Sequence, residues 1–244
     1  MTTPLFLSII IPAYNEEKRL PNTLERVERF LQTQNYPYEV IVVENGSTDR
    51  TLGVAQEFSD GRPAFQAIHL DESGKGRAVR RGMLAARGQF RFMCDADLSM
   101  PIEELPRFLP PNFPDADIVI ASREAPGAVR YNEPEHRHVG GRLINWAIRL
   151  LALPGLQDTQ CGFKIFRGEV AEDLFARQLS VGWSFDIELL YIARRRGYKV
   201  EELPIPWYYS EQSHVSPVKD AFRMIWDIFK IRRNARRGAY AKEN

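Results

Sequence analysis

Two aspartates, Asp95 and Asp97, follow the apolar run at 89–94, which is typical of a buried strand. In an extended chain, residues i and i+2 project to the same side, so both carboxylates can face one point. Two carboxylates that lie close together raise each other's pKa unless a cation lies between them. Mg²⁺ or Mn²⁺ accepts such oxygen ligands and keeps positions open for water and phosphate. The pair therefore predicts a divalent metal site; the alternative is a solvated pair that caps the next helix.

Three further polar segments follow runs of strand-like residues. Residues 12–16 (PAYNE) place an aromatic ring and a carboxylate after the strand expected at 5–11, and 44–49 (ENGSTD) follow the strand expected at 40–43. Gly74-Lys75-Gly76 leaves backbone N–H groups open beside a lysine, which suits a diphosphate near a helix N-terminus. Each segment alone has a simpler explanation, as a helix cap (Asn15, Asp49) or a turn. Four such segments together favour a ligand site.

The remaining pattern alternates strands with helices. Helices are expected at 16–31, 49–58 and 77–86, and further strands at 67–70 and 117–121. Short connections between them predict an α/β fold with a mainly parallel central sheet and helices on both faces. Ligands of such sheets bind at the carboxyl ends of the strands, where the polar segments lie. We expect one catalytic domain over 1–215 and an amphipathic, basic helix and tail over 216–244.

Composition excludes some classes of protein. The 244 residues are 44% hydrophobic and 27% charged, with 33 Lys and Arg against 32 Asp and Glu, so no nucleic-acid partner is expected. Cys94 and Cys161 are interpreted as buried free thiols in a reducing compartment. No uncharged apolar stretch reaches about 18 residues and no signal peptide is apparent, so a membrane protein of this type would bind at the surface.

The order SIIIPAYNEE, VVENGSTDRT, GKGRAVRRG, DADLS and ASR resembles family 2 glycosyltransferases, which have the GT-A nucleotide-diphospho-sugar transferase fold. Residues 158–166 (DTQCGFKIF) and 183–191 (WSFDIELLY) resemble its dolichyl-phosphate β-glucosyltransferase branch, close to other polyprenyl-phosphate glycosyltransferases. The resemblance covers most of the chain. It departs at Glu44-Asn45, where many relatives have two adjacent Asp, and at Ser99, where some have Gln.

The resemblance implies a role for each matching residue. Asp95 and Asp97 would hold the metal, Lys75 would approach the donor, Arg123 would face phosphate charge, and Asp158 would position sugar or acceptor. Asp186 and Glu188 would lie near the sugar and acceptor. The nucleotide-sugar would contact Pro12, Ala13, Tyr14, Glu16, Glu44, Asn45, Lys75, Asp95, Ala96 and Asp97.

The expected reaction moves a hexose, with UDP-glucose the favoured donor, onto a polyprenyl phosphate with inversion and with Mg²⁺ or Mn²⁺. A phosphate monoester has a second pKa of about 6 and is mostly dianionic at pH 7, so the acceptor needs no general base. Three alternatives stay open: a mannosyltransferase using GDP-mannose, a transferase with a soluble glycan acceptor, and a non-catalytic nucleotide-sugar-binding module. A homo-oligomer is also left open.

The acceptor side is expected in the basic segment 122–142, where Arg130, Arg137 and Arg142 could close on a lipid phosphate. His136 and His138 are too few to predict a second metal site. The apolar run 143–153 and a C-terminal helix with a basic end suit an anionic membrane surface, on the cytoplasmic face. The helix carries its apolar face at Val218, Phe222, Ile225, Trp226 and Phe229, and packing of that face on the domain is the alternative.

Overall fold

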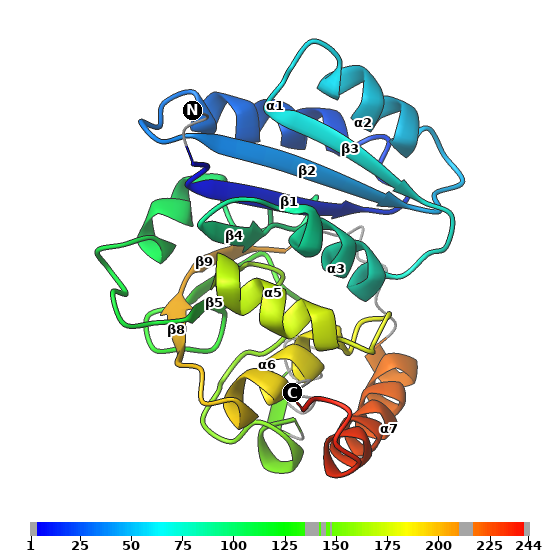
Figure 1. Ribbon diagram of the computed structural model, residues 1–244, viewed down its shortest axis with the longest axis vertical. Coiled ribbons are helices and arrows are strands. Elements are labelled where there is room, and N and C mark those ends of the chain that lie inside the picture. Colours follow the sequence, from blue (N-terminus) through cyan, green and yellow to red (C-terminus); the bar gives the residue numbers. More distant parts are fainter. Residues whose placement is uncertain (1–3, 135–141, 143–144, 147, 210–216, 242–244) are drawn as a thin grey trace.

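Seven strands form one sheet at the centre of the computed structural model (Figure 1). The structure describes residues 4–134, 142, 145–146, 148–209 and 217–241, with the backbone alone for 217–222. The strands are β1 (Leu7–Ala13), β2 (Tyr38–Asn45), β3 (Phe65–Leu70), β4 (Phe90–Met93), β5 (Ile118–Ser122), β7 (Lys164–Arg167) and β8 (Val200–Pro204). Their order in space is β3-β2-β1-β4-β7-β5-β8, and every neighbouring pair is parallel except the two that include β7. The predicted mainly parallel α/β fold is confirmed.

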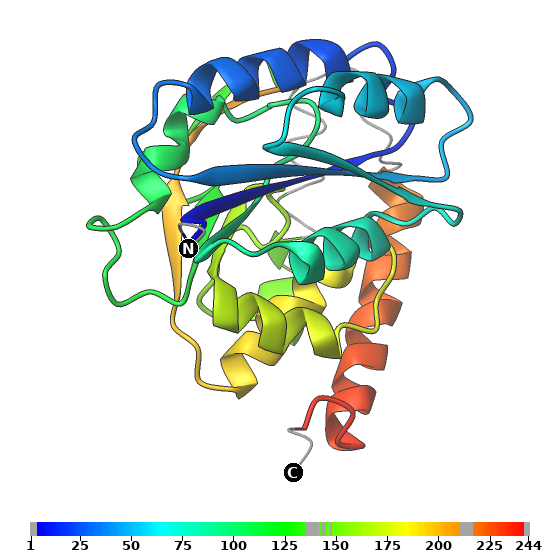
Figure 2. The same cartoon turned by 45° about the horizontal axis from the view of Figure 1, so that its top comes forward.

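Helices cover both faces of this sheet, as Figure 2 shows from a second direction. Alternate residues of β1 point to opposite faces, so Ile9 and Ile11 join one core and Ile10 joins the other. The first core includes α1 (Leu20–Leu31), α2 (Thr51–Ser59) and the 3₁₀ helix η1 (Ile102–Phe108). The second includes α3 (Lys75–Ala85), α5 (Gly168–Arg177), α6 (Phe185–Arg195) and α7 (Pro217–Arg236). Burial on both faces explains why β1 and β2 are nearly continuous apolar runs.

The strands and helices predicted up to residue 121 are all present, with ends shifted by a few residues. One boundary was wrong: Lys75 and Gly76 are the first residues of α3 and not part of a loop. Gly74 has φ 148°, a conformation that favours glycine, and its carbonyl already accepts the N–H of Ala78 at 3.0 Å. Lys75 therefore stands at the N-terminus of a helix, where the orientation of its backbone is fixed.

Beyond residue 121 the structure adds elements that the sequence did not predict. These are β7, α5, α6, β8 and a second, two-stranded parallel sheet of β6 (Val129–Tyr131) and β9 (Pro206–Tyr208). The short strand β7 runs antiparallel between β4 and β5. Its amino end, Lys164, consequently lies at the same edge of the sheet as the carboxyl end of β4, Met93.

Helix α7 has two apolar faces. Met224, Ile228, Ile231 and Ala235 are buried against the domain. Ile225, Trp226 and Phe229 remain exposed, at 37%, 74% and 54% of their surface, while the side chains of Val218 and Phe222 lie outside the described residues. The face with Trp226 and Phe229 is therefore not the one that packs on the domain. Within the described part of the chain, no helix combines the length and apolarity needed to cross a membrane.

Candidate active site

The segments after β1 and β2 are tied together by side chains of both. Ser47 Oγ accepts the N–H of Asn15 at 3.0 Å, and Asn15 Oδ1 accepts the N–H of Thr48 at 2.9 Å. The N–H of Glu16 donates to Thr51 Oγ1 at 2.7 Å. Asn15 has φ 54°, which an asparagine tolerates better than most residues. Its side chain therefore does not cap α1, one of the alternatives considered above, but holds two neighbouring loops at the carboxyl edge of the sheet.

Glu44 and Asn45, at the end of β2, are both buried, and both side chains form hydrogen bonds within the protein. Glu44 Oε1 accepts the N–H of Ser47 at 2.5 Å, and Oε2 is 2.5 Å from His69 Nδ1. Hydrogen bonding to Glu44 raises the pKa of His69. With its amide oriented to satisfy both groups, Asn45 donates to the carbonyl of Ala13 at 2.8 Å and accepts the N–H of Gly74 at 2.9 Å. Asn45 thus links the ends of β1 and β2 to the start of α3.

The other residues predicted to bind the nucleotide lie around this edge. Pro12 and Ala13 are buried at the end of β1, while the Tyr14 ring is 39% exposed. Glu16 forms an ion pair with Arg19 at 2.5 Å. Arg19 also interacts electrostatically with Asp97 and Asp95. The structure therefore brings the predicted nucleoside residues to the same edge as the aspartate pair, and Arg19 interacts with both groups.

Asp95 and Asp97 follow β4, as predicted, and interact electrostatically with each other. Lys75 Nζ lies 2.7 Å from Asp95 Oδ1, and Asp97 Oδ1 accepts the N–H of Ser99 at 3.0 Å. Burial and the Asp95 charge raise the pKa of Asp97. Leu98 has φ 46°, a strained conformation for a leucine that turns the chain sharply after Asp97. Such strain next to polar groups is common at functional sites.

The residues present fit a divalent cation. Asp95 and Asp97 are neighbouring carboxylates whose charges interact, so both can supply oxygen ligands to one cation, which would relieve their repulsion. In the part of the chain that the structure describes, no group of three or more His, Cys, Asp or Glu side chains converges. A cation here would therefore take its remaining ligands from water and from diphosphate oxygens, which is the usual preference of Mg²⁺.

The loop before β7 supports Asp95 from the other side. A Cβ added at Gly162 would lie 1.7 Å from Asp95 Oδ2, so only glycine fits beneath this carboxylate. Lys164 fixes the same loop, because its buried ammonium donates to the carbonyl of Cys161 at 2.5 Å and pairs with Asp186 at 2.7 Å. Burial raises the pKa of Asp186, and the lysines nearby oppose this shift. Asp186 therefore lies in a buried ion pair next to the aspartate site.

Arg123 and Asp158 neutralise each other. Arg123 Nε and Nη2 donate to the two oxygens of Asp158 at 2.6 and 2.9 Å, and the Arg123 backbone N–H adds a third bond at 3.0 Å. Burial raises the pKa of Asp158, but the Arg123 guanidinium outweighs this and lowers the pKa to about 2. Contact with phosphate by Arg123 and with sugar by Asp158 stay predictions. In this structure the two side chains hold the 158–162 loop against the end of β5.

The residues predicted to bind the acceptor do not form one cluster: some are paired or buried, one is exposed, and one lies outside the described residues. Arg130 is paired with Glu124 and with Glu133, the latter at 2.7 Å, and Glu188 is fully buried. Glu188 Oε2 accepts the N–H groups of Leu179 and Ser180, and Oε1 accepts the hydroxyl of Tyr240 at 2.7 Å. Any effect of Glu188 on an acceptor would thus pass through the 179–180 segment. Arg142 is exposed, and Arg137, His136 and His138 lie outside the described residues.

Several site residues were missed by sequence reasoning. Three of them contact a predicted site residue: His69 contacts Glu44, Gly162 contacts Asp95, and Lys164 contacts Asp186. Two others, Trp183 and Trp207, place their rings beside positively charged side chains of the site. Lys75 Nζ lies 5.0 Å from the centroid of Trp183, and the Arg123 guanidinium lies 5.4 Å from that of Trp207. A lysine in the apolar run FKIF was the one available signal, because a buried lysine requires a paired charge.

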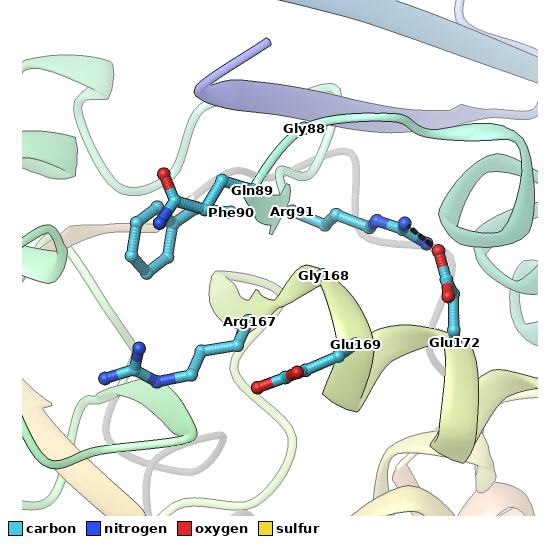
Figure 3. A pocket seen from close by; sticks show the side chains of 8 residues that line it. All are labelled: Gly88, Gln89, Phe90, Arg91, Arg167, Gly168, Glu169 and Glu172. Carbon is cyan, nitrogen blue, oxygen red and sulfur yellow. Dashed lines mark hydrogen bonds and ion pairs between the residues drawn. The ribbon is translucent and has the colours of Figure 1, made fainter. Parts of the chain in front are cut away.

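A pocket of about 350 Å³ lies at the opposite edge of the sheet, at the amino end of β4 (Figure 3). Arg91 crosses it to pair with Glu172 at 2.5 Å, and Arg167 and Glu169 also line it. The pocket contains none of the predicted site residues. Its charges include both signs, and it is separate from the aspartate pair.

Comparison with known proteins agrees with the sequence motifs. The model of the family described as Glycosyl transferase family 2 matches residues 8–175. A dolichyl-phosphate beta-glucosyltransferase of Drosophila melanogaster is 36% identical, over 93% of this chain and 74% of the relative. The protein of the same name from Homo sapiens is 32% identical, over 97% of this chain and 78% of the relative.

Solved structures share the fold at low sequence identity. Mannosyl-3-phosphoglycerate synthase from Rubrobacter xylanophilus has a TM-score of 0.68 at 16% identity, covering 98% of this chain and 77% of that one. Glucosyl-3-phosphoglycerate synthase from Mycobacterium tuberculosis, in complex with Mn²⁺, UDP-glucose and phosphoglyceric acid, has a TM-score of 0.64 at 18% identity and covers 93% and 78%. These likenesses establish the GT-A fold of the chain.

The contact between Gly162 and Asp95 predicts the effect of one methyl group. We expect Gly162→Ala to weaken Mn²⁺ binding about tenfold to hundredfold, because the added methyl group would push the Asp95 carboxylate out of position. Changes that disturb the orientation of a metal ligand have effects of this size. Mn²⁺ titration followed by electron paramagnetic resonance measures this, and circular dichroism checks the fold. Gly53→Ala, on α2, is the control, because a Cβ there would meet only the Glu57 side chain, at 3.9 Å. Unchanged Mn²⁺ affinity in a folded Gly162→Ala protein would contradict the proposed support.

The Arg123–Asp158 pair predicts acid sensitivity. The pKa of Asp158 in the folded protein is about 2, below the ordinary 3.8. The charged Asp158 therefore stabilises the folded state fully above about pH 5, and this stabilisation is lost as the pH falls towards 2. The difference corresponds to about 2 kcal/mol of unfolding free energy. Urea unfolding between pH 6 and pH 3 should show a smaller acid-dependent loss for Arg123→Met. Arg50→Met, which breaks an exposed pair, is the control, and equal slopes for both variants would refute the prediction.

Proposed function

Because the chain belongs to glycosyltransferase family 2, we propose that it transfers glucose from UDP-glucose to a polyprenyl (dolichyl-type) phosphate, with inversion. The observation that carries this proposal is the match to dolichyl-phosphate beta-glucosyltransferases over nearly all of the chain. It includes the 158–166 and 183–191 segments: Gly162 of the first lies against Asp95, and Asp186 of the second pairs with Lys164 of the first. Use of GDP-mannose, a soluble glycan acceptor and a non-catalytic binding role are the alternatives.

The leaving group of this reaction is a nucleoside diphosphate, which gains negative charge as the anomeric bond breaks. A Mg²⁺ or Mn²⁺ ion held by Asp95 and Asp97 would supply charge stabilisation to that group. Lys75, at the N-terminus of α3, adds a positive charge and the helix dipole at the same place. Tyr14, exposed beside Glu44 and Asn45, is suited to contact the nucleoside.

The charges of the site favour a phosphate acceptor over a hydroxyl acceptor. A hydroxyl acceptor needs a general base whose pKa lies near the working pH. Asp158, with a pKa of about 2 in its pair with Arg123, is a poor base. Burial raises the pKa of Asp186, but its carboxylate is occupied by the buried Lys164 ammonium. Glu188 is fully buried and holds the 179–180 segment. A dianionic phosphate monoester attacks without losing a proton, so it requires none of these groups to act as a base.

We also propose that α7 lies on an anionic membrane, on its cytoplasmic face. The exposed face with Trp226 and Phe229 suits the interface between headgroups and acyl chains. Arg223, Lys230, Arg233, Arg236 and Arg237 are exposed on the same helix or just after it, which favours anionic lipid. Arg232 Nη1 donates to the carbonyl of Leu151 at 2.9 Å, so α7 adjoins the helical residues around Trp146 and Leu150, which are also exposed apolar side chains.

The test of the activity is nucleotide release from a panel of donors. UDP-glucose, UDP-galactose, UDP-N-acetylglucosamine and GDP-mannose are each given with Mg²⁺ or Mn²⁺, with and without polyprenyl phosphate. We expect lipid-dependent release from UDP-glucose, lost with chelator and reduced about 100-fold or more by Asp97→Asn, since a metal contributes several kcal/mol of charge stabilisation. Asp60→Asn, at an exposed position, is the matched control.

Other results of this panel select the alternatives. Release from GDP-mannose alone would make the chain a mannosyltransferase, and release without lipid would indicate a soluble acceptor. No release from any donor, with bound nucleotide detected, would support a binding module.

The membrane proposal predicts a difference between two surface variants. Trp226→Glu should weaken binding to vesicles that contain phosphatidylserine about tenfold or more, because a charge replaces a large apolar side chain at the interface. Leu84→Glu, at an exposed apolar position on α3, should leave binding unchanged. Vesicle sedimentation measures both. Equal binding of the two variants would show that the Trp226 face does not contact the membrane.

A further inference from the structure

Lys75 is enclosed in a way that its sequence context did not indicate. The 180–182 segment rests directly on α3, since a Cβ at Gly74 would lie 2.7 Å from the carbonyl oxygen of Val181 and one at Gly76 would lie 2.7 Å from that of Ser180. This packing brings the Trp183 ring over the Lys75 ammonium, at 5.0 Å. Only 16% of the Lys75 side chain remains exposed, and its ammonium pairs with Asp95 Oδ1 at 2.7 Å.

Asp95 has little freedom to turn away from this lysine. Its Oδ1 pairs with Lys75, and its Oδ2 lies where a side chain at Gly162 would begin. The Gly162 backbone is itself fixed, because Lys164 holds the neighbouring Cys161 carbonyl and Arg123 holds Asp158. Rotation of the carboxylate towards the 158–162 loop is therefore blocked.

A divalent cation at Asp95 and Asp97 would meet Lys75 at the same carboxylate. Two cations within about 4 Å repel each other strongly in a partly buried site. Since Asp95 is held in place, it is the flexible side chain of Lys75 that must yield. The donor diphosphate, which would bind beside Asp95 and Asp97, offers the ammonium a new anionic partner close by.

We propose that Lys75 is an exchangeable counter-ion, which neutralises Asp95 in the empty enzyme and passes to the donor diphosphate when the metal binds. This inference rests on the proposed metal and donor site. Its consequence is that metal and nucleotide bind cooperatively through Lys75: the metal alone must displace the lysine, and the nucleotide removes that cost. By linkage, each ligand then strengthens the other by the same factor.

Lys75→Met tests the exchange by binding alone. We expect Mn²⁺ to bind the nucleotide-free variant at least about fivefold more tightly than the native protein, the lower end of typical coupling between sites. UDP should bind the variant more weakly. The ratio of Mn²⁺ dissociation constants without and with UDP should therefore shrink. Electron paramagnetic resonance of Mn²⁺ and calorimetry of UDP measure these constants.

The controls separate exchange from a simple change of charge. Lys199→Met removes an exposed positive charge outside the site and should change neither constant. If loss of the Lys75 charge acted only through space, Mn²⁺ would bind more tightly by an equal factor with and without UDP, and the exchange would be refuted. Weaker or unchanged Mn²⁺ binding to the nucleotide-free variant would refute it as well.

The same measurements keep this inference distinct from the proposed function. If the native protein bound Mn²⁺ but no UDP, the proposed donor would be wrong. If it bound both and turned over no donor, the activity would be wrong while the exchange stayed testable. Unchanged coupling in Lys75→Met, with both ligands bound, would overturn the exchange alone.

Discussion

The carboxylate of Asp95 is held between a cation and a backbone, and the arrangement of the surrounding elements follows from that constraint. Lys75 approaches one oxygen from the start of α3, and Gly162 lies against the other from the loop before β7. Each of these supports is itself fixed by a buried polar group. Asn45 bonds to Gly74 on one side, and Lys164 bonds to Cys161 and Asp186 on the other. The position of one side chain thus depends on strands β1, β2, β4 and β7 together.

Burial of so many charges is tolerated because they alternate in sign. Each buried ion would cost several kcal/mol if left unpaired, which explains why Arg123, Lys164 and Lys75 each have a carboxylate partner within 3 Å. Pairing holds these side chains in place, but it also uses the hydrogen-bonding groups that a ligand would otherwise contact. Arg123 and Asp158, which the family resemblance assigns to ligand contacts, are therefore already paired with each other in this structure. The electrostatics of the site is better described by the network than by any one residue.

The sequence alone predicted those features that depend on neighbouring residues. Asp95 and Asp97 at a strand end, a helix over most of 77–86 and the alternation of strands and helices are local patterns, and the structure has them. The pairing of Arg123 with Asp158, 35 residues apart, and the contact of Gly162 with Asp95 depend on the path of the chain between them. That path depends on β7, a four-residue strand with a charged residue at each end. Its sequence has no hydrophobic periodicity from which a strand could be predicted. For the same reason, the face of α7 that packs on the domain was not distinguished from its exposed face.

The reversed direction of β7 has a consequence for how relatives of this chain can diverge. In a purely parallel sheet, only the segments that follow strands reach the ligand edge, whereas here a segment that precedes a strand also does so. The 158–163 segment before β7 therefore lies beside the aspartate pair, where Gly162 meets Asp95, and it is anchored at Asp158 and followed by the paired Lys164. Insertions or replacements within that segment would change the surroundings of Asp95 while β1, β2 and α3 stay unchanged. Residues added at the junction of β7 and α5, by contrast, would lie beside the pocket at the far edge, remote from the aspartate pair.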